Sequence, residues 1–349
     1  MFNFKKNILL LFVILFLLST FTALTVFIVD PMQHYRKATL YKPYSFEERY
    51  MAWGMLKHYE FDSVLIGTSV TENFTKNYVD KNLKLNILRV PFAGASAYEE
   101  NLLMEEALKN KKLTTILYGL DIFSFQGKKN RLEYGEGTIP YYLKNNTLID
   151  DYKYLLNIDI FFVDNSKIIL SNYFHIKPYK IDYNKFWNWH ERHQVPPKEC
   201  INAYKSLREK KRQLGFKPEL LKSSFNANIL PHIQKNQNVK FVIFFPPYSI
   251  LNWKLREEEG VFNEMLKFKK YLLNTLVKYD NVILYDFQDI KEITHNRANY
   301  IDPIHYSSKI NRWIIEEIKN NNHQVKKSTI NFHLQELEKQ VKDFKSLSF

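Results

Sequence analysis

The sequence predicts an α/β protein with a parallel β-sheet, an N-terminal transmembrane helix and a helical insertion. Five short apolar runs, rich in β-branched residues, have the length and composition of buried strands. They lie at residues 63–66, 87–90, 114–117, 240–245 and 282–285. Amphipathic helical stretches such as residues 98–108 and 263–279 lie between them. Strands that alternate with helices form parallel sheets with right-handed crossovers, covered by layers of helices.

The first element is an uncharged stretch from Ile8 to Val29, preceded by Lys5 and Lys6. About 22 residues at about 1.5 Å each span roughly 33 Å, enough to cross a bilayer core of about 30 Å. The apolar run is too long for a cleaved signal peptide and lacks its small-residue exit, so residues 1–30 are expected to be an uncleaved anchor. The two lysines favour a single-pass protein of the cytoplasmic membrane with its N-terminus inside and its main domain extracytoplasmic, although basic residues beyond the stretch reduce the charge asymmetry.

The rest of the chain is expected to form one α/β domain with additions. Residues 31–59 are aromatic and charged, and are interpreted as a stalk that leads to a domain at residues 60–322. Residues 127–235 break the strand–helix alternation and are interpreted as a largely helical insertion, a lid or side wall at the carboxyl ends of the strands, where open parallel sheets bind ligands. Residues 323–349 contain a C-terminal amphipathic helix, which is expected to pack on the domain because it is too short for a coiled coil.

The composition is basic, with 50 Lys and Arg against 37 Asp and Glu and a formal net charge of +13. Such a charge concentrates anionic partners, so anionic lipid and an anionic cell-surface polymer or glycan are expected. The basic residues form no arginine-rich block, and nucleic acid is not expected as a partner. Neither Gly127 nor Gly135-Glu136-Gly137 follows a strand and opens a helix, so no phosphate-binding loop and no cofactor is predicted. The single cysteine, Cys200, excludes an intramolecular disulfide.

The first predicted strand ends abruptly in Gly67-Thr68-Ser69. A serine at a strand-to-helix turn exposes its hydroxyl at the edge of the sheet, where backbone N–H groups can stabilise an oxyanion. The sequence therefore makes Ser69 a candidate nucleophile. Taken alone, the same serine could equally be the N-cap of the following helix.

A second candidate group follows the last predicted strand, in the sequence Tyr300-Ile301-Asp302-Pro303-Ile304-His305. In Asp-x-x-His one turn can present both side chains, so that Asp302 orients His305 and His305 accepts the proton of Ser69. Taken alone, this pair could also be a capping aspartate and a surface histidine.

The order of these motifs resembles the SGNH/GDSL hydrolase superfamily. The resemblance covers residues 60–125 and 240–320, about half of the chain, and implies a flavodoxin-like three-layer α/β/α fold with a Ser69–His305–Asp302 triad. The superfamily has a glycine after its second strand, and here that glycine is Gly94, whose N–H would be an oxyanion donor together with the N–H of Ser69.

The third motif block of the superfamily is where this chain departs from the pattern. A Gly-x-Asn-Asp sequence is expected after the third strand, but the chain reads Gly119-Leu120-Asp121 and has no asparagine. The oxyanion hole would then depend on the two backbone N–H groups alone, or borrow another donor such as Asn73. Asp121 and Tyr248, which follows two prolines at the end of the fourth strand, are candidate pocket-lining residues.

An N-terminal anchor and a degenerate third block look most like envelope proteins that work beside membrane-bound O-acyltransferases, of the alginate acetylation and D-alanyl-teichoic-acid transfer type. The resemblance implies a membrane-anchored serine esterase or O-acyltransferase that acts on cell-envelope polysaccharide, with the bilayer and a multi-pass O-acyltransferase as partners. The alternatives are a non-catalytic assembly or binding factor with the same fold, and a lipase-like hydrolase of membrane lipids.

A further signal is the segment Trp187-Asn188-Trp189-His190-Glu191-Arg192-His193, whose two histidines could bind zinc. No third ligand is obvious apart from Cys200. The segment is therefore interpreted as an aromatic or glycan-stacking surface, and no metal is predicted.

Overall fold

The computed structural model describes residues 4–44, 46–145, 147–174, 182–189, 198–210 and 216–345. The chain divides into two compact units. Unit 1 comprises Met1–Tyr59 and Gly137–Phe186, and unit 2 comprises Glu60–Glu136 and Trp187–Phe349. The segment interpreted from the sequence as one insertion is thus shared between the two units, and the segment interpreted as a stalk belongs to unit 1. The placement of a lid over the strands stays a prediction.

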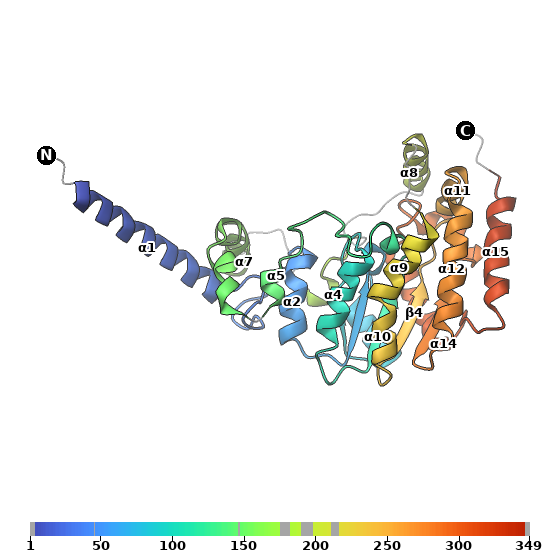
Figure 1. The fold of residues 1–349 in the computed structure, drawn as a ribbon, viewed down its shortest axis with the longest axis horizontal. Helices are drawn as coiled ribbons and strands as arrows, with labels where there is room; N and C mark the ends of the chain where they lie inside the picture. Colours follow the sequence, from blue (N-terminus) through green and yellow to red (C-terminus); the bar gives the residue numbers. More distant parts are fainter. Residues whose placement is uncertain are drawn as a thin grey trace. The chain divides into compact units, whose positions relative to one another are not determined.

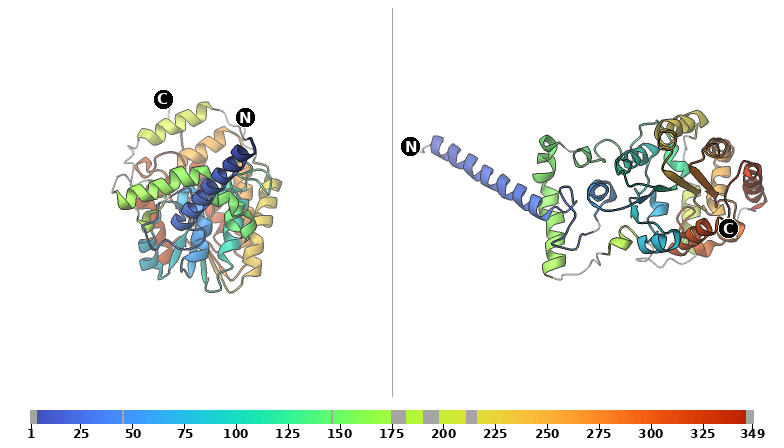
Figure 2. Two further views of the ribbon diagram at one scale, coloured as in Figure 1. Left: turned by 90° about the vertical axis from the view of Figure 1, so that its left-hand side faces the viewer. Right: turned by 90° about the horizontal axis from the view of Figure 1, so that it is seen from below.

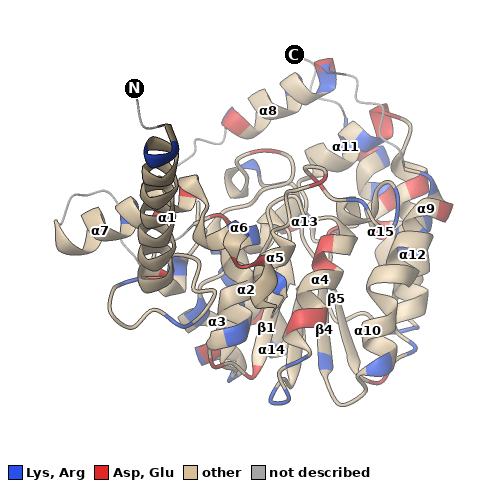
Figure 3. Cartoon of the chain, turned by 60° about the vertical axis from the view of Figure 1, so that its left-hand side comes forward, with Lys and Arg blue, Asp and Glu red and all other residues tan. Residues whose placement is uncertain are grey.

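Unit 1 is helical in its described part, and α1 is by far its longest element (Figure 1). α1 is long and apolar enough to cross a membrane, and charged residues lie only at its N-terminal end (Figure 3). The elements of unit 1 are α1 (Phe4–Val29), α2 (Glu48–His58), α5 (Tyr141–Lys144), the 3₁₀ turn η3 (Leu148–Asp150), α6 (Tyr152–Leu155), the π-helical turn η4 (Ile160–Asp164), α7 (Asn165–Tyr173) and the 3₁₀ turn η5 (Tyr183–Lys185).

Unit 2 contains all five strands found among the described residues and alternates them with helices. Its first half contains β1 (Ser63–Gly67), η1 (Ser69–Thr71), α3 (Lys76–Leu83), β2 (Ile87–Arg89), α4 (Ala97–Ala107), β3 (Thr115–Gly119) and η2 (Ile122–Phe125). Its second half contains α8 (Lys198–Glu209), α9 (Pro218–Asn228), α10 (Leu230–Lys235), β4 (Lys240–Phe245), α11 (Ile250–Glu258), α12 (Phe262–Leu276), β5 (Val282–Asp286), α13 (Lys291–Thr294), η7 (Arg297–Asn299), α14 (Ser308–Asn320) and α15 (Ile330–Asp343).

The five strands form one parallel sheet in the order β2-β1-β3-β4-β5, the order of flavodoxin-type doubly wound sheets. This confirms the prediction of an α/β fold with a parallel sheet. The register pairs Gly67 at the end of β1 with Gly119 at the end of β3. β2 lies on one side of β1, whereas β3, β4 and β5 follow on its other side. Doubly wound sheets bind ligands in the crevice at such a switch point.

Helices cover both faces of the sheet (Figures 1 and 2). On one face, Leu65 and Phe244 belong to a buried cluster with Val79 of α3 and Ile314 of α14. Successive side chains of a strand point to opposite faces, and on the other face α4, α9 and α12 pack side by side. Sheets buried on both sides have nearly continuous apolar strands, which explains why the strands could be predicted from short apolar runs.

The C-terminal helix α15 packs on unit 2, in contact with α11 and α12. Its apolar residues recur at three- and four-residue steps and are buried: Ile330, Leu334, Leu337 and Val341. The expected amphipathic helix is therefore present, and its apolar stripe faces the domain.

Candidate active site

The site lies at the carboxyl end of β1, where the chain turns sharply into η1. Gly67 and Gly119 are needed there because a Cβ atom on either would come within 2.6 Å of the Thr71 side chain. Thr71 itself is fixed, since its hydroxyl donates to the carbonyl oxygen of Thr68 at 2.7 Å. The two glycines thus let η1 pack directly onto the sheet edge, and Ser69 is the first residue of that turn.

The second part of the site is a loop after β5, and Asp302 builds its turn. One carboxylate oxygen of Asp302 accepts the backbone N–H groups of Ile304 and His305, both at 2.8 Å. Those bonds close a short turn that an aspartate favours, because its side chain replaces a backbone acceptor. The other carboxylate oxygen lies 2.7 Å from Nδ1 of His305.

The loop is also tied to the end of β4. The hydroxyl of Tyr300 donates to the carbonyl oxygen of Pro247 at 2.8 Å, and the N–H of Ser249 donates to the carbonyl oxygen of Pro303 at 3.0 Å. Both bonds lie at the carboxyl ends of the strands, so the loop is held at the same edge of the sheet as Ser69.

The three predicted residues are brought together in hydrogen-bonding order. Ser69 Oγ lies 2.7 Å from Nε2 of His305, and Nδ1 of His305 lies 2.7 Å from Oδ2 of Asp302. Because a carboxylate only accepts, Nδ1 carries the proton and Nε2 is the acceptor for the serine hydroxyl. The side chains of His305 and Asp302 are 28% and 31% exposed, so the group is partly open to solvent.

Burial opposes the charged form of both Asp302 and His305, and it is the largest single effect on each. For Asp302, burial is outweighed by the hydrogen bonds from His305, by the charge of His305 and by the hydrogen bond from the N–H of Ile304. The pKa of the carboxyl therefore lies below its usual value. For His305, Asp302 and the charge of Asp121 outweigh burial, so the pKa of the imidazole lies above its usual value. The pair therefore stabilises the imidazolium that forms when His305 takes a proton.

Two backbone groups are candidate oxyanion donors. Among the described residues, no acceptor is bonded to the N–H of Ser69 or to that of Gly94. Gly94 has a φ of +62°, a left-handed conformation that glycine adopts without strain. Its loop is held to the end of β1, since the N–H of Phe92 donates to the carbonyl oxygen of Gly67 at 3.0 Å.

Asp121 and Tyr248, predicted as pocket-lining residues, lie in a buried network behind the turn. Asp121 is 5% exposed and Tyr248 is fully buried. The carboxylate of Asp121 accepts the hydroxyl of Tyr248 at 2.6 Å, that of Thr68 at 2.8 Å and the N–H of Phe123 at 2.9 Å. Asp121 therefore holds the residue that precedes Ser69, and it supplies a negative charge near His305.

Asn73, considered as a substitute oxyanion donor, is buried and uses its carbonyl oxygen to accept the N–H of Trp189 at 3.1 Å. The ring of Trp189 stands edge-on to that of His305, with centroids 5.8 Å apart and planes at 89°. Trp189 is half-buried and is a site residue that the sequence did not identify. The segment stands out in the sequence for its histidines and aromatic residues, but nothing in its pattern points to His305.

The segment before Trp189 is held in place by a buried arginine. The guanidinium of Arg89 donates to the side-chain oxygen of Asn188 at 3.2 Å. Trp187 has a φ of +65°, which is uncommon for a bulky residue and costs conformational energy. His190 and His193, considered for zinc, lie outside the described residues.

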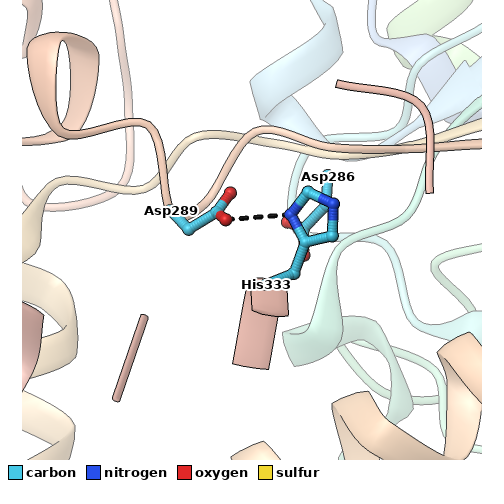
Figure 4. Close-up of side chains that lie close together, drawn as sticks. All are labelled: Asp286, Asp289 and His333. Atoms are coloured by element: carbon cyan, nitrogen blue, oxygen red, sulfur yellow. Dashed lines mark hydrogen bonds and ion pairs between the residues drawn. The ribbon is translucent and has the colours of Figure 1, made fainter. Parts of the chain in front are cut away.

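In the described part of the chain, Asp286, Asp289 and His333 form a buried group that could offer ligands to a metal (Figure 4). His333 Nδ1 lies 2.8 Å from Asp289. Figure 4 marks this contact with a dashed line. However, the ammonium of Lys269 lies 2.7 Å from Asp286 and 2.9 Å from the side-chain oxygen of Gln288. A buried cation thus already balances the charge of Asp286, and the group is best understood as an ion-pair network that anchors α15.

No protein-family model and no curated protein matches the chain.

Proposed function

We propose that the protein is a membrane-anchored serine esterase or O-acyltransferase with an SGNH-type site, acting through Ser69, His305 and Asp302. The observation that carries the proposal is the unbroken chain of two 2.7 Å contacts from Ser69 Oγ through His305 to Asp302 at the carboxyl ends of the strands. A serine hydroxyl is a weak nucleophile until a base takes its proton, and this arrangement supplies an oriented base.

The reaction would proceed through an acyl-enzyme. Ser69 Oγ attacks the acyl carbon while its proton passes to Nε2 of His305, and the N–H groups of Ser69 and Gly94 stabilise the oxyanion. The leaving alkoxide then takes the proton from His305. In the second half, a hydroxyl of the acceptor or a water molecule gives its proton to Nε2 of His305 and attacks the acyl carbon. The bond between the acyl carbon and Ser69 Oγ then breaks, and Oγ takes the proton back from His305.

The proposed acceptor is a cell-envelope polysaccharide or another acidic polymer. The net charge of +13 supports an anionic partner, and the length and apolar composition of α1 support a membrane anchor. Placement in the cytoplasmic membrane with unit 2 outside is proposed from Lys5 and Lys6, which precede the apolar stretch. A multi-pass membrane O-acyltransferase is proposed as the partner that supplies the acyl group.

Labelling with a fluorophosphonate tests this proposal, because the reagent bonds covalently to activated serines. Wild-type protein should be labelled, and Ser69→Ala should not. Ser307→Ala is the matched control, since Ser307 is also half-buried and its side chain makes no cap hydrogen bond at the start of α14. Equal labelling of wild-type and Ser69→Ala protein would refute the proposal.

The second candidate function is a non-catalytic factor that binds polymer or a membrane acyltransferase. Asp121 favours it, because this carboxylate stands where the resemblance expects an asparagine donor and both of its oxygens accept hydrogen bonds. Absence of labelling in the wild-type protein, with envelope acylation fully restored by Ser69→Ala in a deletion strain, would establish this second function.

A further inference from the structure

Unit 1 exposes an unusual number of apolar side chains in the segment from Thr147 to Phe174. Thirteen residues of this segment are exposed, and ten of them are large apolar or aromatic residues. The ten are Leu148, Ile149, Tyr152, Leu156, Ile158, Phe162, Val163, Leu170, Tyr173 and Phe174. Scattered exposed apolar residues are normal on a protein surface, but a concentration of this kind marks an interaction surface. We call these ten residues the apolar surface of unit 1.

This segment packs against the C-terminal part of α1. α6, η4 and α7 all contact α1, and the ring of Phe161 meets that of Phe21 edge-on with centroids 6.0 Å apart. In Figures 1 and 2, α7 lies beside the C-terminal end of α1. The segment therefore lies at the same height along the axis of α1 as the last turns of that helix.

Hydrogen bonds fix the C-terminal end of α1 to the rest of unit 1. The carboxylate of Asp30, the residue after α1, accepts the hydroxyl of Tyr154 at 2.9 Å and the N–H of His34 at 2.8 Å. The guanidinium of Arg36 donates to the carbonyl oxygens of Phe27 and Ile28, which are otherwise unpaired at a helix end. α1 thus leaves the unit in a defined direction and at a defined level.

The position of this contact along α1 then sets how deep the segment from Thr147 to Phe174 lies in the bilayer. Phe21 lies nine residues before Asp30, which places Phe161 about 13 Å below the end of the apolar helix. If α1 left the bilayer at Phe21, only Ile8 to Thr20 would remain inside. That stretch spans about 20 Å, less than the hydrocarbon core of about 30 Å.

We propose that the apolar surface of unit 1 is immersed in the outer leaflet of the bilayer beside α1. The protein is then held by a transmembrane helix and by a second, monotopic contact made by η3, α6, η4 and α7. The proposal rests on the membrane-spanning placement of α1, which is part of the proposed function, and not on the chemistry of Ser69.

Lipid suits this surface better than a folded partner does. None of the ten side chains lines the cavity of about 370 Å³ that lies in the described part of unit 1. They come from several short elements. A fluid apolar phase covers such a surface without shape complementarity. Tyr152 and Tyr173 also belong to the residue types that are enriched where proteins cross the membrane interface.

Spin labelling of the full chain in phosphatidylcholine vesicles tests the proposal. A nitroxide is attached to Phe162→Cys, to Leu15→Cys in α1 and to Phe332→Cys in unit 2, and its access to oxygen and to a water-soluble nickel complex is compared. Phe162 and Phe332 are matched, because they are 65% and 63% exposed. Cys200 stays unlabelled, since it is buried and burial raises the pKa of its thiol to about 12.

The expected result is that Phe162→Cys resembles Leu15→Cys, with high oxygen and low nickel access, while Phe332→Cys shows the reverse. A lipid-like signal at Leu15 with a water-like signal at Phe162 would overturn the apolar contact and leave the anchor standing. A water-like signal at Leu15 would overturn both. A Phe162 label that is water-like in vesicles but shielded in native membranes would indicate a protein partner and would also overturn the proposal.

Discussion

The two units of the chain treat their apolar residues in opposite ways. In the described part of unit 2, the exposed large hydrophobic residues are Tyr134, Leu220 and Phe332, whereas unit 1 exposes most of α1 and ten further side chains between Thr147 and Phe174. Unit 2 buries most of its apolar residues around a sheet and carries the Ser–His–Asp group. Unit 1 lacks strands in its described part and carries the long apolar helix α1. Under the proposed function, unit 2 carries out the chemistry and unit 1 holds it at the membrane.

The largest expected effect lies in unit 2, at the triad. Asp302→Asn keeps the shape of the side chain but lets His305 adopt the tautomer that cannot accept the proton of Ser69, so ester hydrolysis should fall on the order of 10⁴-fold. His305→Ala should be at least as damaging, because the base is lost. Rates with a small acyl ester, measured on variants with unchanged melting temperatures, check both. If both variants kept activity within tenfold of wild type, the triad of unit 2 would not carry out the proposed reaction.

A pair of phenylalanines compares the two units directly. Phe244 on β4 is fully buried, and Phe244→Ala should cost about 3 to 5 kcal/mol of folding free energy because it opens a cavity in the core. Phe162 is 65% exposed, and Phe162→Ala should stay within about 0.5 kcal/mol. Denaturant unfolding of the full chain in detergent micelles measures both. Similar losses would mean that Phe162 is part of a folded core and would break the comparison.

Trp189 should have a smaller, local effect on activity. Its edge-on contact with His305 is of a kind that contributes about 0.5 to 1.5 kcal/mol, so Trp189→Ala should lower kcat/KM by roughly tenfold or less. Trp189→Phe should recover most of the loss, because it keeps an aromatic ring at that position. The fluorophosphonate should still label Ser69 in both variants. Complete loss of labelling in Trp189→Ala would show that the ring supports the whole site instead of one contact.

The smallest expected effect is a shift in pH dependence. His305 is a base only when neutral, so the rate should fall as pH drops through its pKa, which Asp302 and Asp121 hold above 6.5 against the effect of burial. Asp121→Asn removes a negative charge that favours the imidazolium, so the acid side of the pH–rate profile should move to lower pH. Asp280→Asn, an exposed residue, is the control and should leave the profile unchanged. A shift to higher pH in Asp121→Asn would contradict this assignment.

Much of unit 2 could be predicted from the sequence because its signals are local. The strands are short continuous apolar runs, as in Ser63–Gly67, and the candidate triad lies at their ends, in Gly-x-Ser and Asp-x-x-His. Each motif is set by contacts within a few residues, such as the turn that Asp302 makes with the N–H of His305.

The parts of the structure that could not be predicted depend on contacts between residues far apart in the sequence. Unit 1 is closed by bonds such as that between Tyr154 and Asp30, which are 124 positions apart, and no periodicity in either segment indicates the other. Trp189 reaches the site through Asn73, 116 positions before it. The neighbours of Asn73 in the sequence suggest an oxyanion donor and give no sign that its side chain accepts the N–H of Trp189.

Trapping of the acyl-enzyme tests the central claim most directly. Wild-type protein is mixed with 4-nitrophenyl acetate, quenched in acid within the first turnover, digested and analysed by mass spectrometry. The account predicts one acetyl group on the peptide that contains Ser69, and no acetyl group there in Ser69→Ala. Release of nitrophenol by the wild-type protein at an enzymatic rate, with Ser69 unmodified and Ser69→Ala equally active, would contradict it.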